Sequence, residues 1–176
     1  MALPNIVQAG HPVLRADAAP VPADMLGTKR LRDLAATMTE VMRKAPGVGL
    51  AAPQIGLGLA LIVLEDAESL MSRLGPDERA ARGRVAFPLQ VIANPALTTH
   101  GAGRATFFEG CLSVPDFRES VPRAQKVTVR AQDVNGKWYE MTGEDLLARA
   151  FLHETDHLNG KLYMSHVSAL KRALMK

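Results

Sequence analysis

The sequence predicts an α+β fold in which antiparallel β-strands pack around a central helix. Residues 126–131 alternate apolar with polar side chains, residues 137–142 form a further expected strand, and Asn135-Gly136 between them is a strong hairpin signal. Two long segments, one towards each end of the chain, instead carry apolar residues at helical spacing. The hairpin requires antiparallel pairing, which argues against a parallel α/β sheet.

The first helix is expected over residues 26–44 because apolar residues recur there every three or four positions. Its apolar stripe consists of Leu31, Leu34, Met38, Val41 and Met42. We interpret the two methionines as core residues. Glycine and proline punctuate residues 5–21, so we expect an extended arm there with at most one helical turn.

Two further strands are expected before the hairpin. Residues 59–64 form a continuous apolar run, typical of a buried strand. Residues 89–93 form another strand, which we expect Asn94-Pro95 to end. The more polar segment 65–83 between them predicts a partly helical insertion on the surface. After the second helix we expect a short strand over residues 162–164 and a basic amphipathic end over residues 167–176.

The second long helix is expected to begin near residue 145 and to end near residue 158. Thr142 and Asp145 have the spacing of a capping box. Asn159-Gly160 suits a left-handed helix stop. The apolar residues between these signals form two adjoining stripes, so one side of the helix belongs in the core.

This helix carries His153-Glu154-Thr155-Asp156-His157, which spells H-E-x-x-H. Positions i and i+4 share one face of a helix, so two imidazoles there can bind one metal ion, and Glu154 can reach a water on that ion. His153 and His157 occupy positions that a plain core fills with leucine. The fold prediction therefore becomes antiparallel strands around a metal-binding helix. Taken alone, the motif also fits a surface pair of histidines beside a solvated glutamate.

Composition sets limits on the class of protein. The chain has 176 residues, which predicts one domain over residues 1–176. Hydrophobic residues make up 47% and charged residues 22%, as in ordinary globular proteins, and the net charge is +3. No basic block with interleaved aromatic residues points to sequence-specific nucleic-acid binding, and no apolar run reaches the ~20 residues of a membrane span.

Two more segments bear on function. In residues 47–54, Gly-Val-Gly-Leu-Ala-Ala-Pro-Gln, small residues let a backbone approach a ligand closely, and Gln54 offers one side-chain amide. A phosphate-binding loop is excluded because no Lys-Ser/Thr pair follows. Residues 109–113, Glu-Gly-Cys-Leu-Ser, contain the single cysteine, Cys111. A single cysteine fits a reducing compartment, and is most simply a small buried hydrophobe.

Together, residues 47–54, 109–113 and 153–157 resemble the three signature motifs of the peptide deformylases, in the family's order. The resemblance spans nearly the whole chain. It implies a hydrolase that removes the formyl group from N-terminal formylmethionine of new polypeptides. It implies a metal bound by Cys111, His153 and His157, with Fe²⁺ as the natural ion. Ligand chemistry alone leaves Ni²⁺, Co²⁺ and Zn²⁺ open.

The resemblance also implies roles for other residues. Glu154 is expected as the general acid and base, Gln54 and the backbone N–H of Leu112 as the oxyanion hole, and Gly49 as a partner of the substrate backbone. Further residues are expected to contact the substrate, three of them lining an apolar methionine pocket. The pocket residues are Val48, Leu146 and Ala150, for which a place in the plain core is the alternative, and the others are Gly110 and Arg118. Arginines near a site are more often only solvated surface.

Two features near the site extend this interpretation. Arg123 and Asp156 are expected to pair and so to support the metal helix. Leu152 stands where the family often has glutamine, and we expect this change to leave activity intact because the position carries no ligand. The long 65–83 segment resembles that of the organellar-type branch of the family.

Nascent formylmethionyl peptides are the expected partners. The basic end, with Lys171, Arg172 and Lys176, suggests ribosome contact, although a solvated helix face explains these cations more simply. We expect a cytoplasmic location, because the first residues lack the pattern of a signal peptide. The alternative is a mitochondrial or plastid matrix protein whose presequence has been removed.

Two rival functions remain. A metallopeptidase of the H-E-x-x-H kind would usually take a third ligand from a downstream residue, and His166 is the one histidine that follows His157. A non-catalytic module with a structural metal would normally need a fourth ligand, which no second cysteine can supply.

Overall fold

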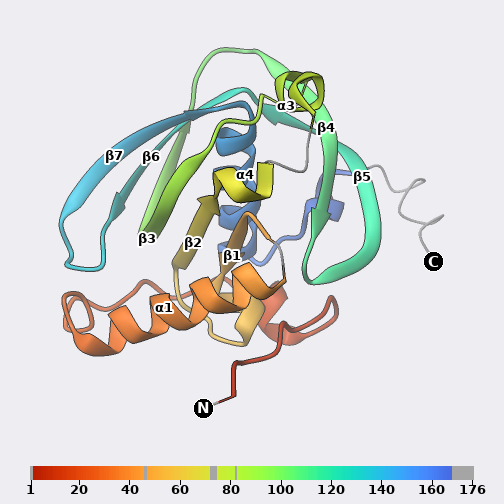
Figure 1. Ribbon diagram of the computed structural model, residues 1–176. Helices are drawn as coiled ribbons and strands as arrows, with labels where there is room; N and C mark the ends of the chain where they lie inside the picture. The colour runs from red at the N-terminus through yellow and green to blue at the C-terminus, as the bar shows by residue number, and fades with distance from the viewer. Residues whose placement is uncertain (1, 46, 72–74, 82, 168–176) are drawn as a thin grey trace.

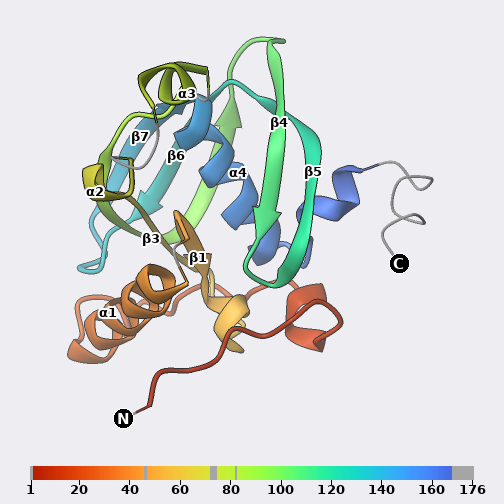
Figure 2. The same ribbon diagram turned by 45° about the vertical axis from the view of Figure 1, so that its right-hand side comes forward.

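The computed structural model describes residues 2–45, 47–71, 75–81 and 83–167. It contains a five-stranded sheet and a two-stranded sheet, and every strand pair in both is antiparallel. The helix that carries H-E-x-x-H lies between the two sheets (Figures 1 and 2). The predicted α+β fold with a central helix is therefore confirmed.

The elements have the following bounds. The larger sheet has the strand order β1 (Gly49–Ala51), β2 (Leu61–Asp66), β3 (Phe87–Thr99), β6 (Lys126–Gln132) and β7 (Trp138–Glu144). The smaller sheet pairs β4 (Arg104–Cys111) with β5 (Val114–Ala124). The helices are α1 (Lys29–Lys44), α2 (Glu68–Met71), α3 (Pro76–Ala81) and α4 (Asp145–Leu158). Short 3₁₀ helices are η1 (Pro12–Arg15), η2 (Ala52–Ile55) and η3 (Tyr163–His166).

Strand β2 is buried on both faces, as its continuous apolar run predicts. Leu61 and Val63 pack in the cluster that includes the inner side of α1. Ile62 and Leu64 pack in the opposite cluster, which includes Phe151 of α4. The sheet is thus covered by α1 on one face and by α4 on the other. Because one side of α4 packs against the sheet, the orientation of the helix and of the motif it carries is fixed.

Helix α1 matches the predicted helix except at its start. It begins at Lys29 and not at residue 26, because Thr28 caps it by accepting a hydrogen bond from the Leu31 N–H at 3.3 Å. Four of the five predicted stripe residues are buried, and Leu34 is partly buried. The single turn η1 agrees with the expected arm over residues 5–21.

The β6–β7 hairpin is confirmed, but the predicted capping box of the next helix is wrong. Thr142 lies inside β7, where its hydroxyl is 2.7 Å from that of Thr128 on the paired strand. Helix α4 follows β7 directly, and its N-cap residue, Glu144, makes no side-chain capping bond. The predicted stop is correct, since Gly160 adopts a left-handed φ of 61° immediately after the C-cap.

Two other local predictions are wrong. Asn94-Pro95 does not end β3, which runs on to Thr99 through a register shift. Asn94 adopts φ 53° there, and its amide bonds both the Val21 backbone and the Gln132 side chain, so the residue forms a bulge. Residues 162–164 do not form a strand, because η3 begins at Tyr163.

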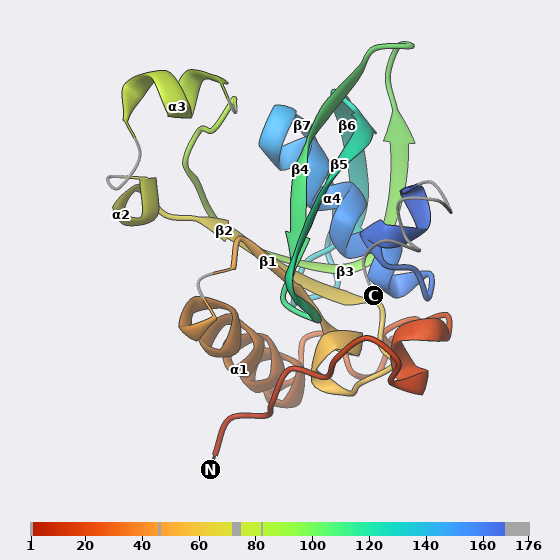
Figure 3. The same ribbon diagram turned by 90° about the vertical axis from the view of Figure 1, so that its right-hand side faces the viewer.

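The insertion over residues 65–83 is partly helical, as expected, since it includes α2 and α3. Figure 3 shows both helices together at one side of the molecule. Not all of it is on the surface, however. Asp66 is fully buried and forms a two-bond ion pair with Arg84 at 2.7 and 2.8 Å, and Met71 is buried as well. The Asp66–Arg84 pair therefore joins the start of the insertion to the residue that follows its end.

Helices in the described part of the chain lack the length and apolarity that crossing a bilayer requires. The basic residues Lys171, Arg172 and Lys176 lie outside the described residues.

Candidate active site

Cys111, His153 and His157 meet in one cluster. Helix α4 places the two histidines one turn apart, and Cys111 comes from the end of β4. Their ligand atoms all lie within 4.8 Å of one another, and Cys111 Sγ is 3.3 Å from His157 Nε2. A thiolate and two imidazoles suit iron, zinc, cobalt or nickel. This is the one such group among the described residues. Three protein ligands would leave one position of a four-coordinate ion for water or substrate, as in catalytic sites.

A network of ion pairs holds the cluster in place. His153 Nδ1 lies 3.0 Å from a Glu109 carboxylate oxygen, which leaves Nε2 to face the cluster. Arg123 donates two bonds to Glu109, at 2.8 and 2.9 Å, and one to Asp156 at 2.7 Å. The predicted pair between Arg123 and Asp156 is therefore confirmed. Such partners fix the orientation of a ligating imidazole.

The protonation states match this arrangement. Burial raises the pKa of Glu109, but hydrogen bonds from Arg123 and His153 outweigh burial and lower it to about 2, so the carboxylate is charged. Burial lowers the pKa of His157 to about 3, with the charges of His153 and Arg123 adding to the effect. His157 is therefore a neutral imidazole, the form that binds metals.

Glu154 is a buried carboxyl group with an unusual pKa. Only 5% of its surface is exposed, and its Oε2 has no hydrogen-bond partner among the described residues. Burial raises its pKa to about 7; the charge of His153 opposes this, and the carboxylates of Glu109 and Asp156 add to it. A group with a pKa near the working pH can both accept and release a proton, which is what a general acid and base does.

Gln54 and Leu112 lie beside the cluster. The Gln54 side chain is buried, and its carbonyl oxygen accepts a bond from the Ala51 N–H at 2.9 Å. This bond aims the amide nitrogen at Ser113 Oγ, 3.3 Å away, and at Cys111 Sγ, 3.6 Å away. Leu112 follows Cys111 at the tip of the β4–β5 hairpin and lines the same pocket.

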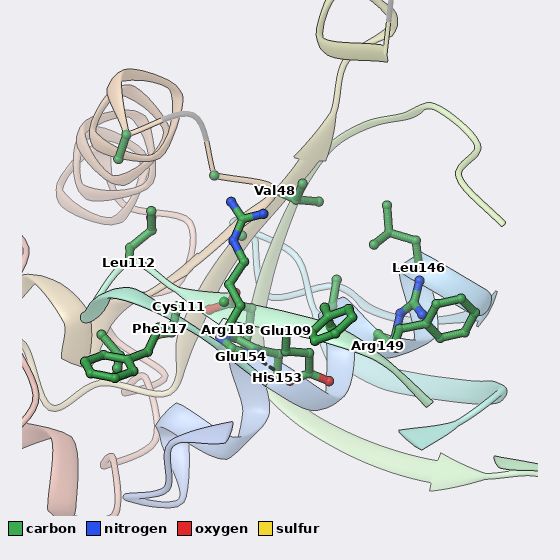
Figure 4. A pocket seen from close by; sticks show the side chains of 18 of the residues that line it. Val48, Glu109, Cys111, Leu112, Phe117, Arg118, Leu146, Arg149, His153 and Glu154 are labelled. Atoms are coloured by element: carbon green, nitrogen blue, oxygen red, sulfur yellow. Dashed lines mark hydrogen bonds and ion pairs between the residues drawn. The ribbon is translucent and has the colours of Figure 1, made fainter. Parts of the chain in front are cut away.

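A pocket of about 850 Å³ opens over the cluster, and Figure 4 shows its lining. Leu146 and Arg149 lie at one end, Leu112 and Phe117 at the other, and Cys111, His153 and Glu154 between them. The structure brings the predicted residues together on this pocket except His157, which is buried beneath it. The predicted substrate contacts found on it are Val48, Gly49, Gly110, Arg118, Leu146 and Ala150.

Several lining residues were not predicted. They include Arg84, Phe107, Phe108, Phe117 and Arg149. For Arg149 a signal existed, because it precedes His153 by four positions and so shares its helix face. For Phe107 the signal was its even spacing from Cys111, which places both on one face of a strand. Arg84 required the tertiary structure, since its buried partner Asp66 lies at the other end of the insertion.

The rival interpretations lose support from this geometry. His166 does not join the cluster, because its Nε2 lies 2.8 Å from Asp156. The third ligand atom comes instead from the upstream Cys111. Leu152 packs against the core that α4 shares with the larger sheet, so it belongs to the helix support and not to the ligand set.

A Cys-His-His cluster that could hold a metal, next to a buried carboxyl group below a pocket, is typical of a metal-dependent hydrolase. Sequence comparison narrows the class, because residues 3–173 match the polypeptide deformylase family. The chain belongs to this family. Its members are hydrolases that remove the N-formyl group from newly synthesised polypeptides.

Individual relatives agree with this assignment. The chain is 46% identical over 167 residues to "Peptide deformylase 1A, chloroplastic" of Solanum lycopersicum, covering 95% of this chain and 60% of that protein. It is 46% identical over 175 residues to the peptide deformylase of Acidobacterium capsulatum, covering 99% and 92%. A Met-Ala-Ser-bound class I type b peptide deformylase from Acinetobacter baumannii superposes with a TM-score of 0.84 at 31% identity, covering 94% and 99%.

Proposed function

We propose that the chain hydrolyses the N-formyl group from the N-terminal formylmethionine of nascent polypeptides. The observation that carries this proposal is the buried Glu154 carboxyl, with a pKa of about 7, beside the Cys111–His153–His157 cluster. Membership of the deformylase family supports the choice of substrate. So does the tripeptide Met-Ala-Ser bound to the Acinetobacter relative, which has the sequence of a deformylated product.

Cys111, His153 and His157 are proposed to hold the metal, and we propose Fe²⁺ as the natural ion. The donor set fits, because the three ligand atoms lie within 4.8 Å of one another and His157 is neutral. Ni²⁺, Co²⁺ and Zn²⁺ suit the same donors. When bound, such an ion would polarise the formyl carbonyl and lower the pKa of a water molecule, so that hydroxide is available as the nucleophile near neutral pH.

The protein groups divide the remaining work. Glu154 takes a proton from the attacking water and delivers it to the amine nitrogen that leaves. Negative charge develops on the formyl oxygen in the transition state. The Gln54 amide and the Leu112 N–H are proposed as its donors, and loss of one such donor typically costs ~10²–10³ in turnover. The hydrogen bond that the Ala51 N–H donates to the Gln54 carbonyl oxygen keeps that amide in its orientation before substrate arrives.

The pocket is proposed to bind the start of the peptide. Val48, Leu146 and Ala150 supply apolar surface for the methionine side chain. Strand β1 is an edge strand of the larger sheet, so Gly49 can pair with an extended peptide backbone. Gly110 and Arg118 lie on the opposite, β4–β5 side of the pocket.

A deformylation assay tests the proposal. Protein purified and iron-loaded without oxygen is given formyl-Met-Ala-Ser, and formate release is measured. Unformylated Met-Ala-Ser is the matched control, because a peptidase would cleave it and a deformylase would not. Formate release with intact Met-Ala-Ser is expected. Cleavage of the Met–Ala bond without formate release would contradict the proposal and support a metallopeptidase.

We further propose one catalytic domain over residues 1–176 and a cytoplasmic location, with a mitochondrial or plastid matrix as the alternative. The tomato relative is chloroplastic by name and the Acidobacterium relative is bacterial, which supports either setting. Ribosome contact through the basic end, residues 170–176, is a separate proposal. Deletion of residues 170–176 should weaken a salt-sensitive association with ribosomes. Unchanged co-sedimentation at low salt would contradict it.

A further inference from the structure

Arg149 is a buried cation on the pocket wall. Only 7% of its surface is exposed, and it lies on α4 one turn before His153. Its guanidinium carbon stands 3.7 Å from the centre of the Phe107 ring. Both side chains line the pocket. In Figure 4 Arg149 lies at the same end of the pocket as Leu146, away from Arg118.

The Arg149–Phe107 pair joins the two elements that carry the metal ligands. Arg149 comes from the histidine helix α4, and Phe107 comes from β4, four residues before Cys111. A buried cation is costly unless it is compensated. An aromatic face is one compensation, and the attraction strengthens when water is excluded. The close contact between the guanidinium and the ring therefore restrains the position of the Phe107 side chain.

We propose that Arg149 is a specificity-determining residue, which holds the Phe107 ring as the end wall of the pocket that receives the substrate's first side chain. This inference rests on the proposed function. The long, unbranched methionine side chain fits between this wall and the apolar residues Leu146 and Ala150. A bulkier aromatic side chain would need the ring to swing away, which the stacked guanidinium prevents.

The alternative is that Arg149 merely braces α4 against β4. The two roles differ in what they change. If Arg149 only holds α4 against β4, its loss lowers the rate for all substrates equally, because it acts on the proposed metal ligands and Glu154. A wall changes the ratio of rates between substrates with different first side chains. Pocket contacts of this size typically change such ratios by about 10–200-fold.

The test compares formyl-Met-Ala-Ser with formyl-Phe-Ala-Ser. In Arg149→Ala, the ratio of kcat/KM for the Phe peptide to that for the Met peptide should rise roughly tenfold or more, mainly through KM. Arg149→Lys keeps the charge without the planar group and should fall between. In a Phe107→Ala background, Arg149→Ala should leave the ratio unchanged, because Arg149 acts through the ring.

Arg130→Ala is the matched control. The Arg130 guanidinium carbon lies 4.3 Å from the centre of the Trp138 ring, and neither residue lines the pocket. This variant should leave the ratio as in the unaltered protein. An equal loss of rate on both peptides in Arg149→Ala, or the same shift from Arg130→Ala, would overturn the inference. If Arg149→Ala does not fold, Arg149→Lys decides by the same ratio.

Calorimetric binding of Met-Ala-Ser and Phe-Ala-Ser separates this inference from the proposed function. A protein that binds Met-Ala-Ser selectively but releases no formate from either formylated peptide contradicts the proposed function alone. The Arg149 variants are then compared by their affinity ratio. Unaltered protein that shows no preference between the two peptides contradicts the inference alone.

Discussion

Gly49→Ala should damage catalysis while leaving the metal in place. A Cβ at Gly49 would contact Glu154 Oε1 and would lie 2.8 Å from the Glu154 carboxyl carbon and 2.7 Å from Leu64 Cδ2. Ordinary contacts for such an atom begin at 3.4 Å. The carboxyl group must move by about 0.6 Å, the difference between 3.4 and 2.8 Å, and the buried Leu64 side chain must move as well.

The size of the effect follows from this displacement. A shift of about 1 Å in a reacting group can cost ~10² in rate, so we expect kcat to fall roughly 10- to 100-fold. The overpacking itself should destabilise the protein by about 1–3 kcal/mol. Metal content should stay unchanged, because the three atoms nearest to the added Cβ belong to Glu154 and Leu64 and not to the proposed ligands.

Steady-state deformylation, metal analysis and thermal unfolding on the same preparation measure all three quantities. Gly58→Ala is the control, since a Cβ there meets nothing within 4 Å. Turnover of Gly49→Ala within twofold of that control would refute the reasoning, because Glu154 would then tolerate displacement. Loss of metal together with activity would also refute it.

Further predictions concern Glu154 and Cys111. Glu154→Gln should retain the metal and lose about 10²–10⁴ in turnover; near-normal rates with bound metal would remove Glu154 from the mechanism. In metal-free protein the Glu154 carboxyl has a raised pKa, so between pH 4.5 and about 7 it keeps a proton in the folded state that it loses in the unfolded state. The free energy of unfolding therefore falls as the pH rises through this window. Chemical unfolding should therefore find metal-free Glu154→Gln more stable than the unaltered protein at pH 8, by on the order of 3 kcal/mol at most, and equal near pH 4. The iron-loaded enzyme should lose activity in air as the Cys111 sulfur is oxidised, whereas the nickel-loaded enzyme should not. Mass spectrometry of the Cys111 peptide checks this, and unmodified Cys111 in inactive iron enzyme would contradict it.

The sequence predicted those elements whose local pattern agrees with their surroundings. Helix α1 and the β6–β7 hairpin each have a solvent side and a core side, and strand β2 is buried on both faces. The spacing of apolar residues along each of them therefore predicts its secondary structure. Thr142 misled because its short polar side chain suits a helix cap and a cross-strand hydroxyl pair equally well. Only the tertiary structure distinguishes the two.

The β4–β5 pair escaped prediction for a different reason. It is a two-stranded sheet with one face towards the pocket, and the consecutive Phe107 and Phe108 break the alternation that marks a strand. Phe107 faces Arg149, whereas Phe108 is 75% exposed. The residues proposed as ligands came from motif resemblance. Arg149 did not, because its spacing of four from His153 indicates only a shared helix face, whereas its burial against the Phe107 ring depends on the tertiary structure.

The shortness of β1 limits the number of substrate residues that can pair with this strand. An open sheet edge usually invites aggregation, and native proteins keep such edges short. Strand β1 has three residues, so at about 3.3 Å per residue it offers a template of ~10 Å. Under the proposed function, pairing with this edge samples only the first few residues of a client chain. The same brevity would therefore guard against self-association and let one enzyme serve a whole proteome, whatever sequence follows the first residues.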